Sequence, residues 1–295
     1  FWEWVKNYEI LELNKKVLDL NKKRYQLVKK YFALGERPAI DTVEAFTQLQ
    51  SFEAKTIESQ NKYNVSTIEL SQFLWKENGE NYNLPLFTKP SELLNTQFTQ
   101  DYFIITEKLL QNIDAQYALN YYFEKSKSLE LERKLKWQNF LPKINFNYNL
   151  YNKEFKNQDI LPLFDNNYQY GIKLELPIFM REARADYQNI KLKILQNNEN
   201  IKFKNQELKT KIQTYNAEMG NFLSLTQNNE SLIENYKRLL KAEEIKFSNG
   251  ESSLFLINSR ENKLLETQEK FLELKAKTIK TYFKLNWLEN NTLKQ

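Results

Sequence analysis

The sequence predicts a mainly α-helical protein that carries one β-hairpin. Only 5 Gly and 6 Pro occur among its 295 residues, so the chain can turn sharply in few places and its elements must be long. Apolar residues recur at spacings of three and four through most of the chain, which is typical of helices that pack as coiled coils. One stretch instead alternates apolar and polar side chains with the two-residue period of a strand.

Glycines and prolines set the limits of the expected helices. Gly35 and Gly250 are expected to end helices, because glycine adopts the left-handed conformation of a helix C-terminus at little cost. Pro38 marks the start of the next helix, and Pro142 marks the start of a strand. We expect helices over about 1–35, 38–78, 92–140, 181–248 and 252–290.

The apolar stripes of these helices predict coiled-coil contacts. The first helix carries a stripe that only Arg24 interrupts, formed by Ile10, Leu13, Val17, Leu20, Leu27, Tyr31 and Leu34. The helix at 181–248 has a strict seven-residue repeat, formed by Tyr187, Ile194, Ile201, Leu208, Tyr215 and Phe222. Such a repeat stays aligned with a neighbour only if the helix supercoils left-handedly.

The last helix carries two adjacent stripes, which predicts neighbours on both of its flanks. One stripe contains Ile257, Leu264, Phe271 and Leu285, and the other contains Leu265, Leu272 and Ile279. This pattern favours a ring or tube of helices over a simple two-helix coil. We interpret every stripe as a packing surface rather than a cofactor site.

The alternating stretch predicts an antiparallel hairpin over about 143–179. One face of each strand is apolar, with Ile144, Phe146, Tyr148 and Leu150 on the first strand and Tyr170, Ile172, Leu174 and Leu176 on the second. The opposite face is rich in Asn, Gln, Lys and Glu. A tilted strand of about 9 to 11 residues spans a bilayer, and tyrosines suit its interfaces. We therefore expect the apolar face to contact lipid, although a soluble sheet on a core is the commoner setting for such strands.

Two strands cannot close a barrel, because lipid leaves no water to pair their free edges. Closure must come from several chains, and even the smallest usual barrel has about eight strands. A shared barrel that continues into a tube of helices would enclose a water-filled conduit. The strand face rich in amides would then line its lumen.

Composition narrows the class of protein. The absence of Cys and His removes thiolate nucleophiles, disulfides and the usual zinc ligands, so we assign no catalytic residue, metal or cofactor. Lys and Arg exceed Asp and Glu by only five charges, and the two signs are interspersed, which disfavours nucleic acid as a partner. No uncharged apolar run reaches the roughly 18 residues that a membrane-spanning helix needs. Lack of cysteine suits the bacterial cell envelope.

An internal repeat relates the two glycine turns. Phe32, Gly35 and Glu36 recur 215 residues later as Phe247, Gly250 and Glu251. We therefore divide the chain into the remainder of a first repeat at 1–78, a linker at 79–91 and a second repeat at 92–295. Since the first copy lacks its own hairpin, we expect the chain to be truncated at its N-terminus.

The sequence resembles the TolC-like outer-membrane efflux protein family. The resemblance rests on FLPKINFNYNL at the helix-to-strand junction, LELPIFMREARADY at the strand-to-helix junction, and KFSNGESSLFLINSRENKLLETQ at the second glycine turn. It implies a homotrimer with a shared barrel in the outer membrane and a helical barrel in the periplasm of a Gram-negative bacterium. It also implies a periplasmic adaptor (membrane fusion) protein and an inner-membrane transporter as partners, in a tripartite efflux or type I secretion system. Tip residues that would meet the adaptor are Phe32, Gly35, Glu36, Arg37, Phe247, Gly250 and Glu251.

The resemblance also implies a ring of carboxylates that narrows the lumen near the tips. Leu256 and Ser259 occupy the family positions after the second turn, whereas Asp41 and Glu44 lie at the equivalent offsets after the first. Three copies of Asp41 in a narrow tube would raise one another's pKa and attract cations. The alternative is a solvated carboxylate at a helix start. Arg37 could pair with Glu36 or Asp41, or bridge subunits.

Two other functions remain open at this point. A soluble periplasmic coiled-coil scaffold would use the hairpin only as a capping sheet, without a pore. An enzyme is a distant third possibility, because the scattered carboxylates show no spacing beyond that of ordinary helix faces.

Overall fold

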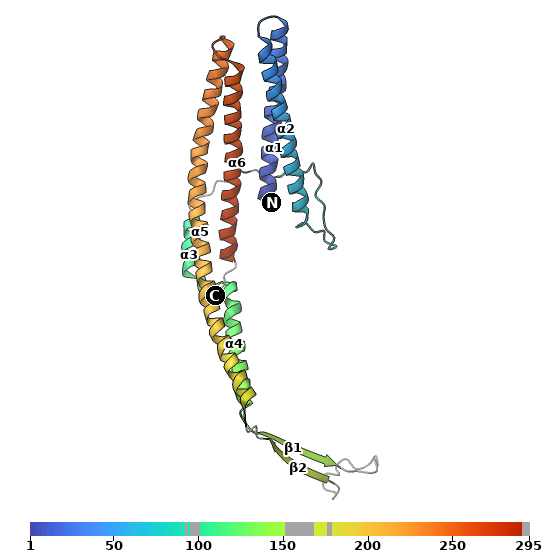
Figure 1. The fold of residues 1–295 in the computed structure, drawn as a ribbon, viewed down its shortest axis with the longest axis vertical. Coiled ribbons are helices and arrows are strands. Elements are labelled where there is room, and N and C mark those ends of the chain that lie inside the picture. The colour runs from blue at the N-terminus through green and yellow to red at the C-terminus, as the bar shows by residue number, and fades with distance from the viewer. Residues whose placement is uncertain (92–93, 95–100, 151–167, 176–178, 291–295) are drawn as a thin grey trace. The chain divides into compact units, whose positions relative to one another are not determined.

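A computed structural model describes residues 1–91, 94, 101–150, 168–175 and 179–290 of the chain. It consists of long helices and one two-stranded antiparallel sheet (Figure 1). The elements are α1 (Trp2–Ala33), α2 (Ala39–Ser71), α3 (Asp101–Gln111), the 3₁₀ turn η1 (Ile113–Ala115), α4 (Tyr117–Gln138), β1 (Lys143–Leu150), β2 (Tyr168–Glu175), α5 (Arg181–Ser248) and α6 (Leu254–Asn290). The mainly α fold with one hairpin is therefore confirmed. None of the described helices combines the length and the apolarity needed to cross a membrane.

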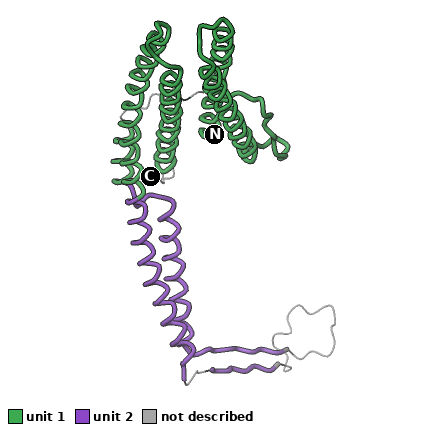
Figure 2. Tube along the Cα trace, turned by 45° about the horizontal axis from the view of Figure 1, so that its top comes forward, with its two compact units in different colours: residues 1–111, 211–290 green, residues 112–210, 291–295 purple. Residues whose placement is uncertain are grey.

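The chain divides into two compact units (Figure 2). The first unit contains Phe1–Gln111 and Lys211–Asn290, and the second contains Asn112–Thr210. Helix α5 runs through both units, with the limits that the sequence predicts.

In the first unit, α1 and α2 lie side by side (Figure 1). Both helices also contact α6, and so does α3. A hydrophobic core joins the start of α1, the end of α2 and the last third of α6, and it includes Trp4, Tyr63 and Ile279. The Trp4 ring lies 6.3 Å from that of Tyr63, and its indole N–H donates to Thr67 Oγ1 at 2.9 Å. The buried Trp4 side chain thus has an aromatic neighbour for its ring and a hydrogen-bond acceptor for its N–H group.

The buried face of α1 differs from its predicted stripe. Leu20, Leu27, Tyr31 and Leu34 are exposed in the single chain. The α1 side chains that are buried along its length include Leu11, Asn14, Asn21 and Val28. Two of the six buried α1 residues are therefore polar, and the C-terminal half of the apolar stripe has no cover within the described residues of the chain.

The stripes of α5 and α6 agree better with the prediction. None of the six heptad residues of α5 is exposed, and Leu208 among them is buried. On α6, residues from both predicted stripes are buried, including Ile257 and Leu285 from one and Leu265 and Ile279 from the other. Helix α6 thus packs on both flanks.

Helix α2 ends at Ser71, so the expectation that it continues to Asn78 is wrong. The chain folds back instead through a turn in which Lys76 N–H donates to Glu80 O at 2.8 Å and Gly79 adopts a φ of +81°. The returning chain is fixed to the helix end, since Leu84 N–H donates to Ser71 Oγ at 2.9 Å. The Asn-Gly dipeptide within this turn, Asn78 and Gly79, is a turn signal.

The expected continuous helix at 92–140 is also wrong. Gln116 has extended φ and ψ angles of −68° and 133°, and with η1 it separates α3 from α4. Its side chain is buried. Its carbonyl then accepts the N–H groups of Leu119 and Asn120, which begins α4. Residues 92–93 and 95–100 lie outside the described part of the chain.

In the second unit, polar contacts join α4 to the first part of α5. Asn197 Nδ2 donates to the Tyr122 carbonyl at 3.0 Å and to Ser126 Oγ at 2.7 Å. Nearer the sheet, Lys136 Nζ lies 2.6 Å from Asp186 Oδ2. These contacts hold together α4, which leads into the hairpin, and α5, which leads out of it.

Candidate functional site

The turn between α1 and α2 is built around Gly35. Its φ is +75°, its N–H donates to Phe32 O at 2.9 Å, and Glu36 N–H donates to Tyr31 O at 2.9 Å. These two bonds define a Schellman motif, which satisfies carbonyls that the helix end would otherwise leave free. Pro38 follows as the N-cap of α2.

The turn between α5 and α6 repeats this geometry at Gly250. Its φ is +78°, its N–H donates to Phe247 O at 3.1 Å, and Glu251 N–H donates to Lys246 O at 2.9 Å. The short sequence match between the two turns therefore has the same backbone form in both places. Division of the chain into two repeats stays a prediction.

Arg37 joins the two turns. Its Nη2 donates to the Phe247 carbonyl at 3.0 Å, and its guanidinium carbon lies 3.9 Å from the centroid of the Phe247 ring. Its Nη1 also lies 3.9 Å from Asp41 Oδ2. Of the partners proposed from the sequence, Asp41 is therefore the one that Arg37 meets, and the second turn of the same chain is an addition that the sequence did not indicate.

A small apolar cluster lies beneath this contact. It consists of Val28, Ala45 and Leu254, with Tyr25 and Phe247 packed against it. The Phe247 ring thus lies between the cluster and the Arg37 cation, an arrangement that favours a cation–π contact.

The two predicted gate carboxylates have different environments. Asp41 is buried and faces Arg37, whereas Glu44 is half-buried and lines a groove of about 450 Å³ between α2 and α6 that Ser259 also lines. Burial, and then the neighbouring Asp41 carboxylate, raise the pKa of Glu44 above its usual value. The structure thus brings Glu44 and Ser259 together, while their role as a gate stays a prediction.

Arg24 on α1 and Glu261 on α6 form an ion pair that the sequence does not predict. Arg24 donates two hydrogen bonds to the Glu261 carboxylate, at 2.7 and 3.1 Å, and Asn21 Nδ2 donates a third at 3.0 Å. Further along, Gln48 and Asn262 exchange amide hydrogen bonds of 3.0 and 3.3 Å. A charge inside a heptad stripe is the signal that pointed to Arg24, but it did not name the partner.

The hairpin of the second unit has one apolar face. Cross-strand pairs on this face are Ile144 with Leu174, Phe146 with Ile172 and Tyr148 with Tyr170, which matches the predicted register of faces. All six side chains are exposed, by 39% to 71%. The side chains of Leu150 and Leu176, also predicted to face lipid, lie outside what the structure describes.

The opposite face is polar. Asn145 pairs with Lys173, and Asn149 pairs with Gln169. The sheet therefore has one apolar and one polar face, as the alternation predicts, and no described helix covers its apolar side.

Comparison with solved structures shows that the chain has the fold of the TolC-like outer-membrane efflux proteins. The Campylobacter jejuni outer membrane channel CmeC matches with a TM-score of 0.73 at 17% identity, over 100% of this chain and 61% of that chain. The outer membrane protein VceC of Vibrio cholerae matches with a TM-score of 0.73 at 14% identity, over 96% of this chain and 66% of that chain. The open state of the Neisseria gonorrhoeae MtrE outer membrane channel matches with a TM-score of 0.63 at 12% identity, over 96% and 62%.

The likeness confirms the fold that the sequence motifs imply. The chain spans about three fifths to two thirds of the length of these structures. No protein-family model matches the sequence, and no curated protein sequence matches it.

Proposed function

We propose that the chain is a subunit of an outer-membrane channel, the exit duct of a tripartite efflux or type I secretion system. Three copies form the channel. Their strands make one β-barrel in the outer membrane, and their long helices make a tube in the periplasm. The channel is a passive conduit, so no chemistry is assigned to its residues.

The exposed apolar face of the hairpin is the observation that carries this proposal. Fully burying a side chain such as Phe146 or Ile172 is worth about 1.5–3 kcal/mol, so six of them in water are a large cost. Outer-membrane lipid removes that cost for one face while water in a lumen solvates the other. Because two strands leave open edges, which lipid does not tolerate, the barrel needs strands from further copies.

The helices of the first unit support the same assembly. Apolar side chains on α1 and α2 stay exposed in the single chain, among them Leu27, Leu34, Val43 and Ile57. Monomeric soluble proteins rarely expose long apolar stripes. A second copy of the chain laid against these helices would cover them.

The two glycine turns are the proposed docking point for the periplasmic adaptor, which links the channel to an inner-membrane transporter. Phe32, Glu36 and Glu251 are exposed there and present both apolar and charged groups. Arg37 fixes the second turn beside the first. An adaptor would thus meet two turns held in one arrangement.

Reconstitution tests the proposal. Full-length protein, extracted from membranes in detergent, is expected to be trimeric by mass measurement and to give stable ionic conductance in planar lipid bilayers. A protein that stays in solution without detergent and gives no conductance would instead favour a periplasmic coiled-coil scaffold, and the channel proposal would fail.

A further inference from the structure

Two turns of the chain contain the same tripeptide, Asn-Gly-Glu. Residues 78–80 lie in the turn that follows α2, and residues 249–251 lie in the turn between α5 and α6. Both asparagines are exposed. An asparagine that precedes glycine loses its side-chain amide more readily than other asparagines, because glycine has no Cβ to keep its backbone nitrogen away from the side-chain carbonyl carbon.

This reaction takes place within the chain and needs only water from the solvent. The glycine nitrogen attacks Cγ of the asparagine and forms a C–N bond, while the Cγ–Nδ2 bond breaks and ammonia leaves with the proton of the glycine N–H. Water then opens the resulting succinimide ring at either of its two carbonyls, which gives aspartate or isoaspartate. Since both sites have the same three residues, a large difference in rate between them has to come from the structure.

The Asn78 side chain is folded back over the peptide that would react. Its Oδ1 accepts the N–H of Glu80 at 3.1 Å, which is the hydrogen bond of an Asx turn. This bond closes a ring that passes through the Gly79 nitrogen, so it keeps Cγ of Asn78 close to that nitrogen. The Glu80 N–H also polarises the side-chain carbonyl and stabilises the negative charge that develops on Oδ1 during the attack.

Asn249 lacks this arrangement. Its side chain makes no hydrogen bond with any residue that the structure describes. Its own N–H donates to the carbonyls of Ile245 and Lys246, both at 3.2 Å, and Glu251 N–H donates to Lys246 O at 2.9 Å. The backbone around Asn249 is therefore held by the hydrogen bonds of a helix end.

The attacking nitrogen must also be released from a hydrogen bond in each turn. Gly79 N–H donates to Lys76 O at 2.9 Å, and Gly250 N–H donates to Phe247 O at 3.1 Å. The turn at Gly79 is closed by an isolated β-bridge, whereas Phe247 packs in the apolar cluster of the two glycine turns and its carbonyl accepts a bond from Arg37. Local opening therefore costs less free energy at Gly79 than at Gly250.

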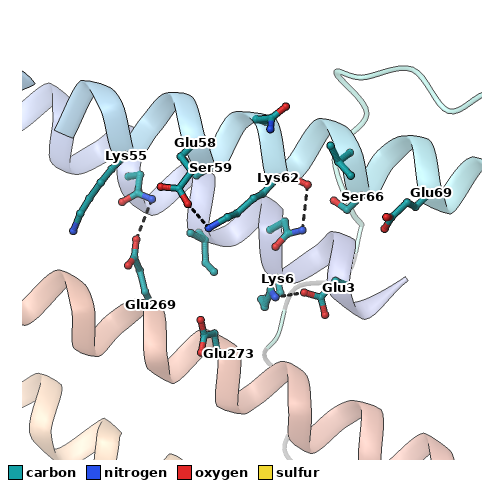
Figure 3. Close-up of a pocket in the computed structure, with 15 residues that line it drawn as sticks. Glu3, Lys6, Lys55, Glu58, Ser59, Lys62, Ser66, Glu69, Glu269 and Glu273 are labelled. Atoms are coloured by element: carbon teal, nitrogen blue, oxygen red, sulfur yellow. Dashed lines mark hydrogen bonds and ion pairs between the residues drawn. The ribbon is translucent and has the colours of Figure 1, made fainter. Parts of the chain in front are cut away.

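Asparagines within the helices have partners on other helices. Around the groove between α1, α2 and α6, Asn7 Nδ2 donates to the Lys62 carbonyl at 3.3 Å, and Asn14 Nδ2 donates to Glu269 Oε1 at 3.1 Å (Figure 3). Neither asparagine precedes a glycine. These side chains thus lack both features that Asn78 combines.

We propose that Asn78 is a site of spontaneous deamidation and that it reacts well before Asn249. Aspartate at this position places a third carboxylate beside those of Glu77 and Glu80. Isoaspartate instead adds one atom to the backbone of a turn whose length sets the bond between Lys76 N–H and Glu80 O. Both products weaken the turn that folds the chain back onto the end of α2. The site is independent of the channel function, since it requires only this turn.

Incubation of the full-length, detergent-extracted protein at neutral and at mildly alkaline pH, followed by digestion and mass spectrometry, tests the site. Replacement of the amide –NH₂ by –OH raises the mass of a peptide, and labelling with an isoaspartyl methyltransferase identifies isoaspartate. In the folded protein, the peptide with Asn78 should convert at least about tenfold faster than the peptide with Asn249. Conversion should be faster at the higher pH, because the attacking nitrogen has to lose its proton.

The two sites are matched controls for each other. In protein unfolded by urea, Asn78 and Asn249 should convert at rates within about threefold of each other, because the structural difference is gone. Asn78→Gln should abolish the fast conversion, since glutamine would have to close a larger ring, whereas Asn249→Gln should leave it unchanged. Equal rates at the two sites in the folded protein, faster conversion at Asn249, or an Asn78 that stays intact when folded but converts when unfolded would each overturn the proposal.

Discussion

Replacement of Glu261 by leucine should destabilise the protein strongly, because it leaves the Arg24 cation between helices without its main partner. Glu261 is 7% exposed and Arg24 is 20% exposed at their side chains, and two hydrogen bonds join them. Breaking a buried ion pair from one side costs about 3–5 kcal/mol. Arg24 keeps some solvent and a Glu244 carboxylate at 3.9 Å, so the lower end of that range, about 3 kcal/mol, is expected.

The double variant Arg24→Leu, Glu261→Leu separates the ion pair from simple loss of packing. Removal of both charges should restore most of the loss, to within about 1 kcal/mol of the unchanged protein, since apolar replacements of buried pairs are often neutral. Urea unfolding of the assembled protein, followed by tryptophan fluorescence, gives the four free energies of a double-mutant cycle. An exposed pair provides the control: Glu266→Leu, which removes the partner of Lys263, should change stability by no more than about 1 kcal/mol.

A coupling energy below about 0.5 kcal/mol would refute this reasoning. The Arg24–Glu261 pair would then be a contact without energetic weight, and the polar face of α1 would need another explanation.

Three further predictions concern the turns, the hairpin and Glu44. Gly250→Ala should lower stability by about 1 kcal/mol, because φ at this residue is +78°. Gly220→Ala should instead raise stability by about 0.5–1 kcal/mol, because Gly220 lies inside α5 and has ordinary space for a Cβ. Thermal unfolding of both variants measures the difference. Phe146→Arg should reduce the free energy of folding into lipid vesicles by about 2–4 kcal/mol, whereas Asn147→Arg on the polar face should reduce it by about 1 kcal/mol or less. Equal losses for the two variants would argue against a lipid-facing side. Glu44→Gln should raise the melting temperature near pH 7, because the raised pKa of Glu44 means that its ionised form is disfavoured in the folded state. That gain should shrink as the pH falls through the raised pKa and vanish below about pH 4.3, so a pH-independent gain would contradict the assignment.

Local patterns in the sequence were sufficient for much of the fold. The two glycine turns, the limits of α5 and the faces of the hairpin depend on near neighbours, and each has a specific signal in the chain. Backbone angles at Gly35 and Gly250 and the pairing of Phe146 with Ile172 agree with those signals.

Partners distant in sequence were harder to predict. Periodicity shows which face of α1 is apolar, but not whether the same chain or another copy covers it, so Leu20 and Leu27 were expected in a seam and lie exposed. In the sequence, Arg24 only interrupts an apolar stripe, and nothing links it to Glu261, its partner in the structure. The break at Gln116 was missed because no glycine or proline marks it.

The uncovered stripe of α1 bears on how the protein matures. A chain that has folded alone presents Leu20, Leu27 and Leu34 to water, together with the apolar side of its sheet. Such a monomer is prone to aggregate, because any apolar surface that it meets competes with the other copies of the chain for these side chains. If the chain forms the proposed channel, association must therefore follow folding closely, and the yield of assembled channels should depend steeply on how fast new chains arrive and on whether a holding chaperone shields them in the interval.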